Sequence, residues 1–156
     1  MDKEKFNNFF ETEPLPLQEK SEFSWLLEKV ESIKPNIIVE IGIDKGGSFK
    51  FWNEIVSQNG LAIGIDINDA VDKKWIPVWS RTKIIFGDSS KAETVEKLKE
   101  LLNGNNIDFL YIDGLHNETG VNRDYNLYFP LVRKGGIIGF HDAGEPSKKY
   151  HNVPEA

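Results

Sequence analysis

The sequence predicts an α/β fold of the Rossmann-like, doubly wound type, built on a mostly parallel sheet. Apolar runs typical of buried strands alternate with segments whose apolar residues recur at helical spacing. Most of these runs end in or next to an acidic residue, and a glycine-rich turn follows the first run. Strands and helices that alternate in this way form βαβ units, whose helices cover both faces of a parallel sheet. We therefore expect a ligand site at the carboxyl ends of the strands.

The chain opens with a polar segment over residues 1–20, which Pro14 and Pro16 interrupt and which we expect to form a flexible lead-in. Phe6, Phe9 and Phe10 are spaced for a short amphipathic turn that packs on the body of the protein or on a partner. Residues 21–156 are expected to form one domain. The length of 156 residues suits a single core.

Strands and helices alternate through this domain, and turn residues such as Pro35, Asn59 and Gly60 separate them. The expected helices cover residues 21–32, 48–58, 92–102 and 119–132. The expected strands cover residues 37–41, 61–67, 83–86, 107–112 and 137–140. Residues 69–81 contain Trp75 and Trp79 and predict a broken or short helix.

Composition excludes several kinds of partner. The formal net charge of −6 disfavours nucleic acid, which calls for a basic face on the protein. No apolar run is long enough to span a bilayer and no signal peptide precedes the domain, so no membrane partner is expected. The absence of cysteine excludes disulfides and thiolate metal sites, and we expect a cytoplasmic protein.

Acidic residues mark the carboxyl ends of all the expected strands. They are Glu40, Asp66, Asp88, Asp113 and Asp142. Helix N-caps would explain one or two of them. Because the carboxyl ends of parallel strands meet at one edge of a sheet, the whole set is better explained by one ligand-binding crevice.

The glycine-rich turn after the first strand contains Gly42, Gly46 and Gly47 and lacks the G-x-G-x-x-G spacing of dinucleotide enzymes. Two further turns, Gly64-Ile65-Asp66 and Gly87-Asp88-Ser89, follow it. Together these turns resemble the cofactor motifs of class I S-adenosylmethionine-dependent methyltransferases. The resemblance implies S-adenosylmethionine as cofactor.

The second half of the chain is similar to one branch of that superfamily. It reads Ile-Asp-Gly-Leu-His over residues 112–116, Leu-Val-Arg-Lys-Gly-Gly over residues 131–136, and His141-Asp142. Family-24 methyltransferases share this arrangement, as do the cephalosporin-hydroxylase-like and macrocin-type O-methyltransferases. The resemblance covers residues 37–142. The chain ends where the helix before the family's C-terminal strand pair would begin, so we expect that pair to be lacking.

The resemblance assigns cofactor contacts to the strand ends. Asp66 would bind the ribose hydroxyls, and Asp88 and Ser89 would flank the adenine ring. The methionine moiety would be surrounded by Glu40, Gly42, Gly46, Gly47 and Ser48. Ile67 and Asp113 complete the expected set of contacts.

The resemblance also implies a catalytic base and a metal site. Asp113 and Asp142 stand where related metal-dependent enzymes hold Mg²⁺, and His141 stands at the third ligand. The resemblance implies Mg²⁺ or Mn²⁺ as the metal. A histidine ligand would favour Mn²⁺, Fe²⁺ or Zn²⁺ somewhat over Mg²⁺. His116, three residues after Asp113, stands at the place of the general base. Structural roles are the alternative: His116 would cap a helix, and His141 would support Asp142.

Taken together, the residues predict methyl transfer to a hydroxyl group of a small molecule or sugar, with His116 and Asp113 as catalytic residues. A homodimer is a further expectation. The alternatives are a nicotinamide-dependent oxidoreductase and a non-catalytic cofactor-binding or scaffold domain. Trp52 is interpreted as a core residue, and Arg123 and Asp124 as a surface or inter-helix pair of little energetic weight.

Overall fold

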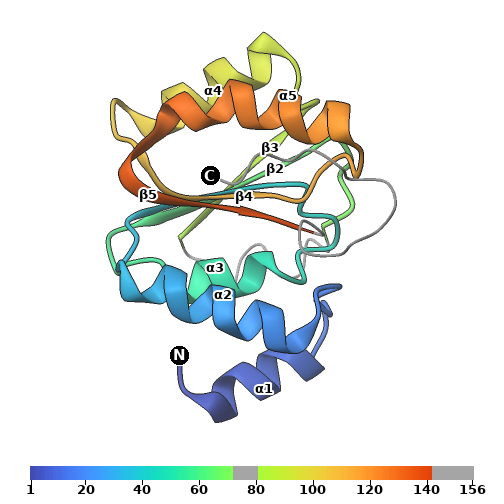
Figure 1. Ribbon diagram of the computed structural model, residues 1–156, viewed down its shortest axis with the longest axis vertical. Coiled ribbons are helices and arrows are strands. Elements are labelled where there is room, and N and C mark those ends of the chain that lie inside the picture. The colour runs from blue at the N-terminus through green and yellow to red at the C-terminus, as the bar shows by residue number, and fades with distance from the viewer. Residues whose placement is uncertain (72–80, 142–156) are drawn as a thin grey trace.

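The structure is a computed structural model that describes residues 1–71 and 81–141. A central sheet lies between two layers of helices (Figure 1). The helices are α1 (Lys3–Glu11), α2 (Lys20–Ser32), α3 (Phe49–Ile55), α4 (Ala92–Leu102) and α5 (Glu118–Tyr128), with a short 3-10 helix at Phe129–Leu131. The strands are β1 (Ile37–Ile41), β2 (Leu61–Asp66), β3 (Thr82–Phe86), β4 (Ile107–Ile112) and β5 (Val132–Phe140).

The sheet has the strand order β3-β2-β1-β4-β5, and all neighbouring strands are parallel. This confirms the predicted α/β fold. The chain passes outward from β1 through β2 to β3 and then returns to the other side of β1 as β4. The reversal lies between β1 and β4, which is where ligands bind in open sheets of this kind.

Each face of the sheet carries its own apolar core. Ile38 in β1 packs with α2 and α3, while Val39 and Ile41 face the core that α4 and α5 cover. This alternation follows from the two-residue period of a strand. Trp52 is fully buried between Phe23 and Phe109, at ring-centroid distances of 5.3 and 5.0 Å, as expected of a core residue.

The N-terminal segment differs from the flexible lead-in that the sequence predicted. Phe6, Phe9 and Phe10 of α1 all pack on Phe51 of α3, with ring centroids 5.5–6.2 Å apart. Their spacing places them on one face of a helix, and burial of that face fixes α1 against the domain. The Nζ atom of Lys50 also donates a hydrogen bond to the carbonyl oxygen of Thr12, at 2.6 Å.

Strand β5 begins earlier than expected, at Val132, because the 3-10 helix that contains Pro130 ends the preceding helix. Trp75, Trp79 and Asp142, which the sequence analysis singled out, lie outside the described residues. Within residues 1–71 and 81–141, no helix has the length and apolar character needed to cross a membrane.

Candidate functional site

A cleft of about 440 Å³ opens at the carboxyl edge of the sheet. Gly42 after β1, Asp66 at the end of β2, Asp88 after β3 and Asp113 after β4 all line it. Ile67, Ser89 and His116 line it as well. The parallel topology thus brings seven of the predicted site residues to one cavity.

Gly42 sits where the ends of β1 and β4 come closest. Its φ angle is +84°, and a Cβ atom there would lie 2.1 Å from the carbonyl oxygen of Asp113. The Asp113 amide donates to the carbonyl oxygen of Ile41, and the Gly42 amide donates to that of Ile65, both at 2.8 Å. Glycine is therefore required here on both conformational and steric grounds.

Asp66 ties together the loops that follow β1 and β2. Its Oδ2 atom accepts a hydrogen bond from the amide of Asp44 at 2.9 Å, and its Oδ1 atom accepts one from the amide of Asn68 at 2.8 Å. A carboxylate oxygen has two acceptor positions, so the half-buried Asp66 can also accept from ligand hydroxyls.

The turn after β3 is held by its own hydrogen bonds. Asp88 Oδ1 accepts from the amide and the hydroxyl of Ser90, at 2.9 and 2.6 Å. These bonds, the hydroxyl's above all, lower the pKa of Asp88 and keep its carboxylate charged. Ser89 turns its hydroxyl toward α5, where it donates to Asp124 Oδ1 at 2.8 Å.

Asp124 does not lie on the surface, as one of the two expectations for its pair with Arg123 had it, although the charge of Arg123 still acts on its carboxyl group. Asp124 is buried, and burial raises its pKa above the ordinary value despite the hydrogen bond from Ser89. Tyr128 fixes the same turn from α5, because its hydroxyl donates to the carbonyl oxygen of Ser89 at 2.8 Å. Arg123 lines the cleft instead.

Glu40 lies beneath the cleft and is fully buried. The Ser48 hydroxyl donates to its Oε1 atom at 2.5 Å, whereas Oε2 makes no hydrogen bond to any described residue. Burial raises the pKa of Glu40 well above its usual range, and the charges of Asp113 and Asp66 add to the rise; the Ser48 hydroxyl and the Trp52 indole oppose it.

The second half of the glycine-rich turn is also buried. Gly46, Gly47 and Ser48 are not among the residues that line the cleft. A Cβ atom on Gly47 would lie 2.1 Å from the carbonyl oxygen of Leu15. Glycine is therefore needed at position 47 because the N-terminal segment passes close over this turn.

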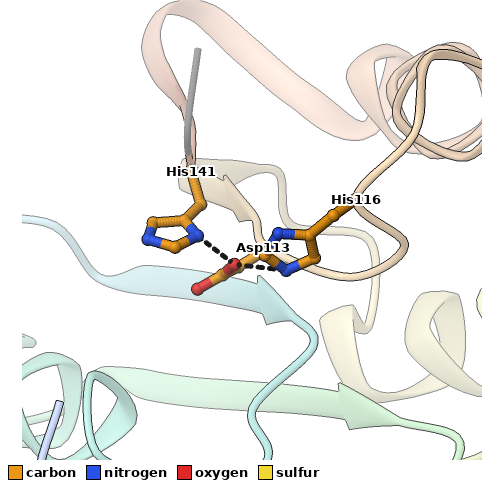
Figure 2. A group of neighbouring side chains, drawn as sticks. All are labelled: Asp113, His116 and His141. Atoms are coloured by element: carbon orange, nitrogen blue, oxygen red, sulfur yellow. Dashed lines mark ion pairs between the residues drawn. The ribbon is translucent and has the colours of Figure 1, made fainter. Parts of the chain in front are cut away.

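Two histidines converge on one oxygen of Asp113 (Figure 2). Asp113 Oδ1 lies 2.8 Å from His141 Nδ1 and 3.3 Å from His116 Nε2. The two imidazoles come from different elements: His141 follows β5, and His116 lies in the loop between β4 and α5. His116 is half-exposed, with 49% of its side chain accessible.

These three side chains offer a group of metal ligands. One ligand atom from each lies within 4.8 Å of the others. A carboxylate oxygen with two imidazole nitrogens is a donor set that fits Mn²⁺, Fe²⁺ or Zn²⁺ and tolerates Mg²⁺ less readily. Of the predicted ligands, the structure brings Asp113 and His141 together; Asp142 falls outside its described part.

The sequence analysis missed Gln18, which reaches the site from the N-terminal segment. Its Nε2 atom donates to Asp113 Oδ2 at 2.8 Å. Gln18 and His141 also line a larger groove of about 990 Å³ between α2 and β5, beside Tyr111 and Phe140. Asp113 thus contacts residues of both cavities. No sequence signal marks Gln18, because it follows no strand.

Comparison with known proteins finds that residues 39–143 match a family described as "Methyltransferase domain". The curated protein "Probable caffeoyl-CoA O-methyltransferase 2" from Dictyostelium discoideum is 28% identical over 124 residues, which cover 77% of this chain and 52% of that protein. This chain therefore spans about half the length of that relative.

Solved structures share the fold. The O-methyltransferase TomG from Streptomyces achromogenes, in complex with SAM, superposes with a TM-score of 0.66 at 14% identity, over 94% of this chain and 72% of that chain. MycE methyltransferase from the mycinamycin biosynthetic pathway, in complex with Mg, SAH and mycinamycin VI, superposes with a TM-score of 0.63 at 22% identity, over 88% of this chain and 38% of that chain.

Proposed function

The chain belongs to the methyltransferase-domain family of the family-24 type, and from this premise we propose that it transfers a methyl group from S-adenosylmethionine to a hydroxyl group. The acceptor is a small molecule or a sugar. One observation carries the proposal: Asp66 and Asp113, the predicted ribose contact and the predicted reaction centre, lie in one cleft on either side of Gly42.

The residues around the cleft fit this cofactor. Asp66 keeps acceptor capacity for two ribose hydroxyls. Gly42 lets the backbone of Asp113 pass close to it, because a Cβ atom there would lie 2.1 Å from the Asp113 carbonyl oxygen, and this close approach brings Asp113 to the cleft. Glu40 supplies a buried carboxyl group under the turn, and the ammonium group of a methionine moiety beside it would favour its ionised form. Ile67, Asp88 and Ser89 are left for the adenine end.

The chemistry asks the protein to position two reactants and to remove one proton. When bound, S-adenosylmethionine would supply a methyl group on a positively charged sulfur, and S-adenosylhomocysteine would leave as the acceptor oxygen bonds to the methyl carbon. His116 is the base that takes the hydroxyl proton, because it is half-exposed at the cleft and imidazole is the side chain that most often serves as a general base. Asp113 orients the His116 ring through Nε2.

A divalent cation fits beside these groups. Asp113 and His141, with Asp142, would hold Mg²⁺ or Mn²⁺, and the ion would supply Lewis acidity toward the acceptor oxygen. The MycE methyltransferase structure is a complex with both Mg and SAH, which supports the same pairing here. A homodimer stays a prediction.

Small acceptors are favoured by the groove between α2 and β5. It offers apolar side chains such as Leu26 and Phe140, and His141 brings it to the cluster around Asp113. The relatives named for caffeoyl-CoA and for the mycinamycin pathway support a small-molecule acceptor.

Calorimetric titration of S-adenosylhomocysteine, with and without Mn²⁺, tests the proposal. We expect micromolar binding to the folded chain, weakened by Asp66→Ala, with no comparable heat from NADH. Replacing His116 with Gln should cut turnover and leave cofactor affinity unchanged. Binding of NADH in place of S-adenosylhomocysteine would favour an oxidoreductase, and full activity of His116→Gln would remove the base assignment.

A further inference from the structure

We infer that Gln18 is a positioning residue of the proposed metal site: its amide holds one oxygen of Asp113 so that the other oxygen is presented to the cation. This inference rests on the proposed function. It concerns a residue of the N-terminal segment, 95 positions from Asp113 in the chain.

The two oxygens of Asp113 have separate partners. Gln18 Nε2 donates to Oδ2 at 2.8 Å, while Oδ1 faces His116 and His141. A partial rotation of the carboxyl group would break the hydrogen bond from Gln18, whereas a half-turn restores the same contacts because the two oxygens are equivalent. The amide therefore fixes the orientation of the carboxylate, which is the usual work of a residue that supports a metal ligand.

The segment that carries Gln18 is itself held on both sides. Pro16 is buried, and the backbone of Leu15 passes so close to Gly47 that no Cβ atom fits between them. On the other side, Glu19 caps α2 by accepting hydrogen bonds from the amides of Ser21 and Glu22, each at 2.9 Å. Gln18 thus reaches Asp113 from an anchored backbone, so little conformational entropy is lost when the contact forms.

The chemistry of the amide also favours this role over simple packing. Gln18 Oε1 is buried and has no hydrogen-bond partner in the described part of the chain. Since burying an unpaired polar atom is unfavourable, an apolar side chain would serve packing alone better. The amide orientation is set by its partner, because only the NH₂ group can donate to a carboxylate.

The test measures Mn²⁺ binding by electron paramagnetic resonance, with S-adenosylhomocysteine present, on the whole chain. Gln18→Met keeps the length of the side chain but removes the donor, and Gln18→Asn keeps the amide but shortens its reach. Loss of such a supporting contact typically weakens metal affinity about 10- to 100-fold. We expect that loss in both variants, with unchanged S-adenosylhomocysteine affinity. Gln58→Met, at an exposed position after α3, is the matched control and should bind as wild type does.

A purely structural role predicts a different result. It would lower the urea midpoint of the Gln18 variants while leaving their Mn²⁺ affinity within about twofold of wild type, well short of the loss expected for a supporting contact, and that outcome would overturn the inference. If wild type itself bound S-adenosylhomocysteine but no Mn²⁺, both the metal proposal and the role of Gln18 would be overturned. If wild type bound neither, the proposed function would fall as well.

Discussion

Replacing Gly42 with alanine should destabilise the protein by two separate mechanisms. The backbone at Gly42 has φ +84°, and a left-handed conformation costs about 1–2 kcal/mol for a residue with a Cβ atom. That Cβ atom would also lie 2.1 Å from the carbonyl oxygen of Asp113 and 2.7 Å from the Cα atom of Gly114. Both contacts are with backbone, so β1 and β4 must shift apart, and such overpacking typically costs about 1–3 kcal/mol. We expect a total loss of about 2–5 kcal/mol in the free energy of unfolding.

Gly104→Ala separates the two mechanisms. Gly104 has nearly the same φ angle, +81°, but nothing lies within 4 Å of the position its Cβ atom would take. This variant should lose only the conformational part, about 1–2 kcal/mol. Urea unfolding followed by circular dichroism gives both values, and S-adenosylhomocysteine affinity should fall for Gly42→Ala alone. Equal losses of stability in the two variants would refute the argument from close approach.

Two further predictions concern Glu40 and α1. Between the unfolded pKa near 4.5 and its raised folded pKa, Glu40 binds a proton in the folded state but not in the unfolded state, so stability falls as pH rises through that window. Glu40→Gln should remove this dependence, which amounts to about 1.4 kcal/mol in the free energy of unfolding for each pH unit of the window. Urea unfolding at several pH values measures it, and an unchanged slope would contradict the prediction. Phe6→Ala should cost about 3–5 kcal/mol, because the ring is buried against Phe51, whereas the exposed Phe129→Ala should change little. If Phe6→Ala lost as little stability as Phe129→Ala, packing of α1 would add nothing to the stability of the core.

The sheet could be predicted because its signals are local. Each buried strand is an apolar run. The acidic residue at its end marks the carboxyl edge of the sheet, where the site lies. The start of β5 could not be predicted, because Arg133 and Lys134 give it no strand pattern. Its pairing depends on a contact between strands: Arg133 Nε donates to Asp108 Oδ1 at 2.5 Å, while Asp108 Oδ2 accepts from the amide of Ile37.

The site could be predicted only where residues follow strands. Asp66, Asp88 and Asp113 reach the cleft because parallel topology places strand ends together. Gln18 was missed because its contact depends on packing of the N-terminal segment, and the burial of Asp124 was missed because it depends on which face α5 turns inward. A contact of this kind has no sequence period, so it becomes visible only once the tertiary structure is known.

The carboxyl groups at the cleft favour binding of a positively charged ligand. Glu40 is buried with one oxygen unpaired among the described residues, and the negative charges of Asp66 and Asp113 raise its pKa further. The same three carboxylates would favour an ammonium group, a sulfonium or a divalent cation, because each would relieve the repulsion between them. A ligand that binds only the folded state adds about 2.7 kcal/mol of stability at about a hundred times its Kd. If Glu40 is ionised in the complex, that gain should grow as pH rises toward the raised pKa of Glu40, since the proton that Glu40 must release then costs less.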